Sequence, residues 1–375
     1  GGEADPARVR GRQVSAELDA ARAVRAGEEL DVAKLEAFLR TAIPDLGGPL
    51  TVEQFPRGHS NLTYLLKAGD REWVLRRPPP GAKAIQSGHD MGREYRVLSR
   101  LHPHYPPAPR AIAYCGEAES PLGTSFYVME RVRGVILRAQ PPPGVPLDTG
   151  TMRRLSESFV NNLAALHRVD VAAAGLSDLG HPEGYVQRQV EGWTQRYAKA
   201  QTDEVADMDA TARWLAAQSP ASGGAALIHN DYKYDNVVLD PDDLSKIRAV
   251  LDWEMATLGD PWADLGSTLA YWVDPDDPDP IQMLAFGPTA LPGNLRRAEV
   301  VERYAAASGR PVQDVAFHYA LALFKVAVIA QQIYFRFKQG FTRDERFASF
   351  GVAVQVLASQ AARAIAAGRV DHLGS

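Results

Sequence analysis

The sequence predicts an α+β fold in two parts, a small antiparallel β-sheet followed by a larger, mostly helical region. Short β-like runs occur between residues 50 and 132, and one helical pattern interrupts them. After Gly134 the strand-like runs nearly vanish, and apolar residues recur at helical spacing. The chain has 375 residues, which exceeds one typical domain and favours two lobes.

The first lobe is expected over residues 31–132. Residues 1–30 are polar and rich in Arg and Glu, and they indicate a flexible or helical extension. A helix is predicted at 31–40, where Asp31 is a suitable N-cap. Strands are expected at 50–55, 62–67, 73–76, 111–115 and 126–129, with a helix at about 91–101.

The second lobe is expected over residues 133–375. Helices are predicted at about 150–168, 183–200, 203–218, 261–272, 296–308, 311–338 and 343–368. An acidic, Pro-rich insert at 273–294 is expected to be irregular. The longest apolar run, at about 317–335, contains polar residues such as Lys325, so it predicts a buried or amphipathic helix and no membrane span.

The most informative stretch is His-Asn-Asp-Tyr-Lys-Tyr-Asp-Asn at 229–236. Asp231 is followed five residues later by Asn236 and then, after a short apolar strand, by Asp252. This is the layout of kinase-like phosphoryl transfer. One carboxylate must accept or orient the proton of the attacking hydroxyl, and an amide oxygen and a second carboxylate must hold Mg²⁺.

The flanks of this stretch predict a catalytic hairpin over residues 225–254. Apolar residues at 225–228 lead into the motif, β-branched residues follow at 237–239, and the run 247–251 delivers Asp252. A strong turn signal separates the last two runs. This geometry brings the three polar side chains around one point, whereas a surface hairpin with solvated side chains is the alternative.

The first lobe should then contact the nucleotide. A turn between two predicted strands can bring backbone N–H groups to a phosphate, and it holds Gly58, His59, Ser60 and Asn61. Arg76 stands where a kinase carries a phosphate-binding Lys, with Glu94 as its expected partner and a surface strand charge as the alternative. The strand that enters the second lobe is expected to offer Met129, Glu130 and Val132 to the adenine base, with an edge strand and an ordinary core Met as the alternative.

Three further residues are expected to support the structure. Asp260 and Asp264 are placed to cap a helix start, and Asp264 is also placed to brace the catalytic loop. His229 is expected to be a structural histidine and not a base.

These pieces, in this order, resemble the aminoglycoside phosphotransferase-like, choline kinase-related family of small-molecule kinases. The resemblance covers about residues 35–340 and is carried by residues 58–61, 74–76, 94, 129–130, 229–236, 252–254 and 259–264. The stretches 74–79 and 251–261 look closest to the branch with kinase-like domains fused to acyl-CoA dehydrogenases in animals. The resemblance implies a two-lobed protein-kinase-like fold that uses ATP and Mg²⁺, with Asp231 as catalytic base and Asn236 and Asp252 as metal ligands.

The spacing of the motifs favours a small-molecule acceptor over a peptide. Gly259-Asp260-Pro261 follows within nine residues of Asp252, and no Ala-Pro-Glu occurs, so a protein-kinase activation segment has no room. The sequence also lacks Lys-Ser or Lys-Thr, Gly-x-Gly and Gly-x-Ser-x-Gly. These absences exclude a Walker A loop, a dinucleotide fingerprint and the commonest esterase signature.

We therefore expect an ATP- and Mg²⁺-dependent phosphotransferase acting on a hydroxyl of a small molecule, such as a hydroxyacyl-CoA. A non-catalytic kinase-like nucleotide-binding module and a true aminoglycoside-resistance kinase are the alternatives. The acidic run at 274–279 is placed to attract a polycation, or it is a solvated loop. The basic aromatic stretch at 334–338, with Arg343 and Arg346, either faces a phosphorylated or acyl-CoA-like acceptor or is an exposed helix face.

Composition limits the partners and the compartment. Hydrophobic residues make up 45% and charged residues 23%, an ordinary globular balance. The net charge of −5 disfavours nucleic acid, and the single Cys115 excludes an internal disulfide and a Cys-based zinc site. The first 30 residues lack the apolar segment of a signal peptide. We expect a cytoplasmic monomer or homodimer without a nucleic-acid or membrane partner.

Overall fold

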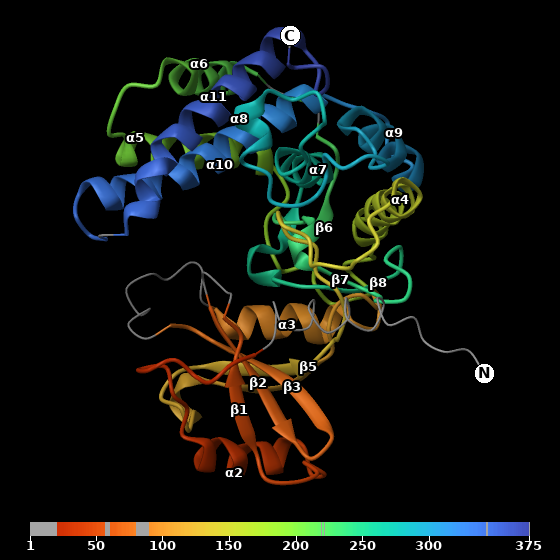
Figure 1. The fold of residues 1–375 in the computed structure, drawn as a ribbon, viewed down its shortest axis with the longest axis vertical. Helices are drawn as coiled ribbons and strands as arrows, with labels where there is room; N and C mark the ends of the chain where they lie inside the picture. The colour runs from red at the N-terminus through yellow and green to blue at the C-terminus, as the bar shows by residue number, and fades with distance from the viewer. Residues whose placement is uncertain are drawn as a thin grey trace.

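The computed structural model describes residues 21–56, 61–79, 90–218, 220, 222–342 and 344–374. The chain forms two lobes, a sheet-containing lobe at the bottom of Figure 1 and a larger helical lobe above it. This is the α+β, two-lobed architecture that the sequence predicts.

The first lobe is built on a five-stranded antiparallel sheet with the order β1-β2-β3-β5-β4. Its elements are α2 (Val32–Ala42), β1 (Thr51–Gln54), β2 (Leu62–Ala68), β3 (Arg71–Arg77), α3 (Met91–Leu101), β4 (Ala111–Cys115) and β5 (Phe126–Glu130), with a short 3₁₀ turn at Glu117–Glu119. Helix α2 packs on the outer side of the sheet, and α3 lies between the sheet and the helical lobe (Figure 1).

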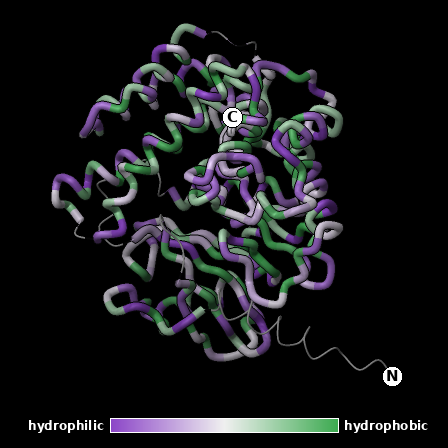
Figure 2. The backbone as a smooth tube through the Cα atoms, turned by 45° about the horizontal axis from the view of Figure 1, so that its top comes forward, coloured by the Kyte–Doolittle hydropathy of each residue, from purple (hydrophilic) through white to green (hydrophobic). Residues whose placement is uncertain are grey.

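Side chains that alternate along the strands pack into two separate hydrophobic cores. In β3, Trp73 and Leu75 pack with Leu35 and Leu39 of α2, while Val74 faces the other side and joins the large core of the helical lobe. Successive side chains of a strand point to opposite faces, so one strand serves both layers. Figure 2 shows hydrophobic stretches along the strands and helices and hydrophilic stretches on many of the connecting turns.

The second lobe is mostly helical. Its helices are α4 (Thr149–Leu166), α5 (Tyr185–Ala200), α6 (Ala206–Ala217), α7 (Pro261–Ala270), α8 (Asp279–Gln282), α9 (Arg297–Ser308), α10 (Val315–Lys338) and α11 (Phe350–Ala367), with 3₁₀ turns η3 (Tyr234–Asn236), η4 (Trp253–Met255) and η5 (Glu345–Ser349). Two small antiparallel pairs lie nearest the first lobe: β6 (Ala226–Ile228) with β9 (Thr257–Gly259), and β7 (Val237–Leu239) with β8 (Ile247–Val250).

Helix α10 is the central helix of this lobe. Within the described residues, two segments are long and apolar enough to cross a membrane by length and composition, α10 and Glu345–Ala367. The apolar window of α10 is 72% buried inside the protein, as expected of a core helix. The window containing α11 is only 33% buried.

The structure differs from the sequence-based expectation in three places. Residues 21–30, expected to be flexible or helical, contain no helix, and Arg22 forms a β-bridge to Gln54. Strand β9 was not foreseen. The insert at 273–294 contains the four-residue helix α8 and is tied to the lobe by buried side chains. Residues 1–20, the turn residues Gly58, His59 and Ser60, and Arg343 lie outside the described residues.

Candidate active site

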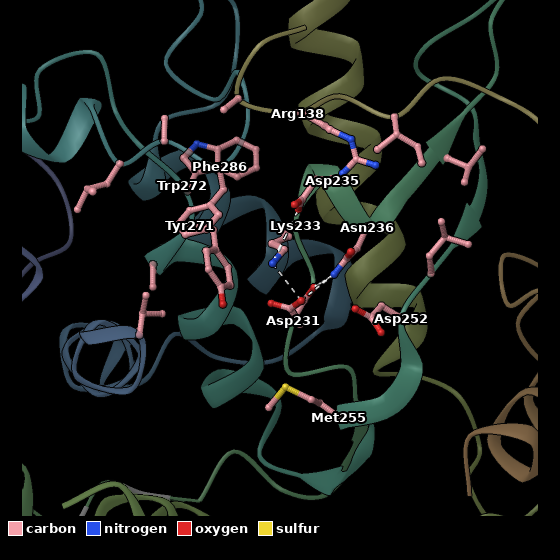
Figure 3. Close-up of a pocket in the computed structure, with 18 of the residues that line it drawn as sticks. Arg138, Asp231, Lys233, Asp235, Asn236, Asp252, Met255, Tyr271, Trp272 and Phe286 are labelled. Atoms are coloured by element: carbon pink, nitrogen blue, oxygen red, sulfur yellow. Dashed lines mark hydrogen bonds and ion pairs between the residues drawn. The ribbon is translucent and has the colours of Figure 1, made fainter. Parts of the chain in front are cut away.

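Asp231, Asn236 and Asp252 meet at the mouth of the catalytic hairpin (Figure 3). The Nδ2 atom of Asn236 donates to the Oδ2 atom of Asp231 and to the main-chain oxygen of the same residue, both at 2.8 Å. Asp252 leaves the end of β8 on the same side, with 34% of its side chain exposed. Since the Asn236 amide nitrogen is used for these bonds, its Oδ1 oxygen is the atom left for a cation.

Left-handed backbone conformations shape this cluster at two non-glycine residues. Asn230 and Asp252 both have φ of 68°, which costs of order 1–3 kcal/mol each and persists only where the surroundings impose it. All four polar atoms of Asn230 are bonded. Its N–H donates to Asp264 at 2.6 Å, its Oδ1 accepts from Tyr185 at 2.9 Å, its Nδ2 donates to the Met255 oxygen at 3.1 Å, and its main-chain oxygen accepts from Lys325 at 3.1 Å.

The carboxylate of Asp264 lies beneath the catalytic loop. It is fully buried and accepts the N–H groups of His229 at 2.7 Å and Asn230 at 2.6 Å, while His167 Nε2 lies 2.9 Å away. Burial alone would raise the pKa of Asp264, but these partners outweigh burial and lower it. Asp260 is the N-cap of α7 and accepts from the Trp262 N–H at 2.8 Å.

The ring of His229 joins the two halves of the hairpin. Its Nε2 atom lies 3.0 Å from the main-chain oxygen of Leu251, the residue before Asp252, and its Nδ1 atom accepts from the Asp231 N–H at 3.3 Å. Because one nitrogen must donate and the other must accept, this pattern assigns a neutral ring with the proton on Nε2. Both ring nitrogens are therefore hydrogen-bonded, and the ring fixes the backbone at Asp231 relative to the backbone just before Asp252.

Arg76 is the centre of a buried ion cluster that links the lobes. Its guanidinium lies 2.9 Å from Glu94, 3.1 Å from Asp252 and 3.4 Å from Glu254. Asn61, the residue before β2, donates to the same Glu254 oxygen at 2.9 Å. Burial alone would lower the pKa of Arg76, but the carboxylates raise it well above its usual value. The structure thus rules out an exposed strand charge at this position.

The residues expected near adenine line a cavity that also contains Arg76 and Asp252. Met129 is buried in β5 opposite Val74 of β3, and both side chains line the cavity together with Glu130 and Val132. The N–H of Glu130 donates to the Arg110 oxygen at 2.9 Å, so this donor is already used within the protein.

Lys233 and Asp235 belong to the site, although sequence reasoning assigned them no role. The Lys233 ammonium lies 3.1 Å from Asp231 and sits over the rings of Tyr271 and Phe286, 4.7 and 5.5 Å from their centroids (Figure 3). Burial alone would lower the pKa of Lys233, but Asp231 and Asp235 outweigh burial and raise it. Burial raises the pKa of Asp235 to about 6.

A cavity of about 1510 Å³ extends from the sheet to the helices α10 and α11. Its volume exceeds the roughly 300–1,000 Å³ of a typical single-ligand site. The sheet wall, as we call it, consists of Asn61 just before β2, Thr63 of β2, Val74 and Arg76 of β3, and residues 129–132. The helix wall consists of cavity-lining residues within 280–286, 319–333 of α10 and 349–357 at the start of α11. Asp231, Asn236 and Asp252 of the catalytic cluster line the same cavity together with Lys233 and Asp235, and we call these residues its floor.

Three carboxylates of the acidic insert form ion pairs with arginines of the same chain. Asp274 and Asp277 are buried against Arg297, whose nitrogens lie 3.6 and 2.5 Å from their oxygens, and Asp276 pairs with Arg296 at 2.8 Å. Both expectations are therefore wrong for Asp274 and Asp277, which form neither a solvated loop nor a free anionic surface, whereas Asp276 and Asp279 are exposed. In the basic aromatic stretch, Arg346 pairs with Asp344 at 2.6 Å.

The residues that were missed left only weak signals in the sequence. Lys233 and Asp235 lie inside the motif, but its spacing drew attention to Asp231 and Asn236 alone. Lys325 is a single cation within an apolar run, and in the sequence it served only to argue against a membrane span. A buried cation in a helix of such composition needs a polar partner, which is the signal that could have identified it.

The two lobes and the cluster at the cavity floor define the chain as a kinase-like phosphotransferase. The model of the phosphotransferase enzyme family (APH) matches residues 51–300. The chain belongs to this family, and the family resemblance of its motifs is confirmed.

Among characterised sequences, acyl-CoA dehydrogenase family member 11 of Rattus norvegicus is 34% identical over 331 residues. The match covers 84% of this chain and 41% of the rat protein. The chain thus spans less than half of the length of this relative.

Two solved structures show the same fold. A protein of Ralstonia eutropha, described as a candidate aminoglycoside phosphotransferase, superposes with a TM-score of 0.76 at 32% identity and covers 88% of this chain and 96% of its own. The aminoglycoside phosphotransferase APH(4)-Ia, solved with ADP and hygromycin B, superposes with a TM-score of 0.55 at 15% identity, covering 88% of this chain and 98% of its own. The second likeness concerns the fold alone.

Proposed function

We propose that this protein transfers the γ-phosphoryl group of ATP to a hydroxyl of a small acceptor that carries an apolar chain, as a hydroxyacyl thioester does. The observation that carries the proposal is the position of Asp231. It lines the same cavity as the charged residues of the sheet wall and the apolar residues of the helix wall. A nucleotide fits the first wall and an apolar acceptor the second.

The donor set fits one Mg²⁺ ion bound together with nucleotide phosphates. Asp252 and the Oδ1 atom of Asn236 are oxygen ligands on one side of Asp231. No cluster of three or more His, Cys, Asp or Glu side chains that could hold a metal occurs in the described part of the chain. Mg²⁺ usually takes one or two protein carboxylates and completes its shell with phosphate and water oxygens. When bound, Mg·ATP would supply the transferred phosphoryl group and its charge neutralisation.

The chain's own residues then have distinct tasks. Asp231 orients the acceptor hydroxyl and accepts its proton as the new O–P bond forms and the bond to the ADP leaving group breaks. Lys233, 3.1 Å from Asp231, adds positive charge beside the transferred group. Arg76 holds phosphate oxygens from the sheet wall. Most of the rate would come from positioning and electrostatics.

The helix wall supports an apolar acceptor over an aminoglycoside. From α10 it presents Leu323, Val326, Ile329 and Ile333 to the cavity, and α11 adds further aliphatic side chains. Polycationic acceptors need carboxylates, yet Asp274, Asp276 and Asp277 of the acidic insert are paired with Arg296 and Arg297. The long apolar surface favours an aliphatic chain at roughly 25 cal/mol per Å² buried.

ADP formation across hydroxyacyl-CoAs, sugars, amino alcohols and aminoglycosides tests the proposal. Asp231→Ala should lower turnover by about 10²-fold or more, since general-base catalysis and orientation are of that order. Asp279→Asn, on the exposed side of α8, is the matched acidic control and should turn over normally. Unchanged turnover in Asp231→Ala, or nucleotide binding without transfer to any acceptor, would favour the alternative of a non-catalytic module.

A further inference from the structure

Lys325 is a buried cation without a counter-ion in the described structure. Its side chain lies in the middle of α10, and the residue is 8% exposed. Among the residues that the structure describes, no Asp or Glu oxygen lies within 4.0 Å of its ammonium. Burial lowers its pKa, and the more distant Asp231 and Asp264 oppose that shift only in part. Such an arrangement is costly, because buried charges are normally paired.

The ammonium of Lys325 has unused donors that line the cavity. It makes one hydrogen bond within the protein, to the main-chain oxygen of Asn230 at 3.1 Å. An ammonium carries three N–H donors. The Lys325 side chain lines the cavity on the same wall as Val326 and Ile329. It is the only charged residue of α10 that does so, so a polar donor stands in an otherwise apolar wall.

The ammonium of Lys325 lies close to Asp231, where its unused N–H donors could bind an acceptor. Asn230, which accepts its bond, immediately precedes Asp231, so the ammonium lies beside the catalytic loop while its residue lines the apolar helix wall. An acceptor whose hydroxyl faces Asp231 and whose chain lies along α10 must pass Lys325. An oxygen of that acceptor near the hydroxyl would meet the ammonium.

We propose that Lys325 determines acceptor specificity by donating a hydrogen bond to a carbonyl or carboxylate oxygen that lies near the phosphorylated hydroxyl. This rests on the proposed function. It assigns the class of acceptor more narrowly, as a hydroxy acid or its ester or thioester. A charge-assisted bond in a site that excludes water discriminates strongly, because an acceptor without the oxygen leaves the cation unpaired.

Three acceptors with the same chain and hydroxyl position test this inference: a free hydroxy acid, its thioester, and the alcohol that lacks the carbonyl group. In Lys325→Met, which keeps the length and the apolar wall, kcat/KM should fall about 10- to 100-fold more for the carbonyl-containing acceptors than for the plain alcohol. A loss confined to the free acid identifies a carboxylate; a loss for both identifies any carbonyl oxygen. Lys325→Arg should restore part of the discrimination.

The plain alcohol separates recognition from support of the loop. If Lys325 only holds the main chain of Asn230, all three acceptors lose activity by the same factor in Lys325→Met, and the inference is overturned. Ile329→Met, one turn further along the same wall, is the matched control and should change the three acceptors equally. Nucleotide-induced thermal stabilisation of each variant reports folding independently. If wild-type protein phosphorylates none of the three, the proposed function itself fails.

Discussion

The two walls of the cavity treat buried charge in opposite ways. On the sheet wall, Arg76 lies within 3.4 Å of three carboxylates, and its charge is more than balanced. On the helix wall, Lys325 has a main-chain oxygen and no ion pair among the described residues. A wall with its charges already balanced can hold a ligand that brings its own cation, as Mg·ATP does. A wall with a spare positive charge is suited to a ligand oxygen.

Replacing Arg76 and Lys325 in turn should give the largest difference, in the free energy of unfolding. Arg76→Met should lower the free energy of unfolding by about 3–5 kcal/mol, because buried Glu94 loses its partner. The loss should be smaller at pH 5 than at pH 8, because Glu94, whose pKa burial already raises, can then be protonated. Lys325→Met should change stability much less, since no paired charge is left behind. Urea unfolding of both variants at both pH values measures this, and equal losses would break the comparison.

Asp235, on the floor of the cavity, should have the next largest effect, on how stability depends on pH. Burial raises the pKa of Asp235 from 3.8 to about 6, so the folded protein binds this proton more tightly than the unfolded chain. Its contribution to stability is therefore present below about pH 4 and lost as the pH rises to about 6, a change of about 1–3 kcal/mol. Asp235→Asn should remove this decline and be more stable than wild type at pH 8. Chemical unfolding of the ligand-free protein between pH 4 and 8 tests it; parallel curves would contradict it.

Replacing the guanidinium of Arg76 by an ammonium should change the KM for ATP and leave the KM for the acceptor unchanged. Arg76→Lys keeps the charge but loses the planar fork that reaches Glu94, Asp252 and Glu254 together. We expect KM for ATP to rise about tenfold, near the value of one charge-assisted hydrogen bond. Steady-state kinetics with each substrate varied would show this. An equal rise in the acceptor KM would mean that the walls do not act separately.

Introducing a polar residue at the exposed edge of the helix wall should have the smallest effect, and this effect should be confined to long-chain acceptors. Val352 of α11 lines the cavity and is 62% exposed in this chain. Val352→Asp should raise KM severalfold for long-chain acceptors and leave short-chain acceptors, ATP and stability nearly unchanged, because exposed substitutions usually cost under about 0.5 kcal/mol. A series of acceptors that differ only in chain length provides the measurement.

Local sequence patterns predicted much of the fold because helices and strands leave periodic signals. Strands β2 and β3 and helices α3, α4 and α10 lie close to where apolar spacing placed them. Strand β9 was not predicted because it has only three residues and pairs with β6 across the intervening residues 229–256. The acidic insert was misread because its partner Arg297 follows it in α9, and burial of the pair depends on how the helices pack.

The candidate site shows the same limit. Asp231, Asn236 and Asp252 were found because one short hairpin carries all three. Lys325 is distant from them in sequence, and only the packing of α10 against the catalytic loop brings its ammonium to Asn230. The turn residues Gly58, His59 and Ser60 lie outside the described residues, so their expected contact with phosphate remains a prediction.

The ring of His229 has a consequence for how such an enzyme can diversify. By bonding Leu251 and Asp231, it couples the base and the expected metal ligand into one rigid piece that rests on Asp264. Residues of α10 and α11 other than Lys325, which bonds Asn230, can then be exchanged without resetting the distance between these groups. An engineer could therefore treat the helix wall as a replaceable module and seek new acceptors by varying it, while the chemistry on the floor is inherited unchanged.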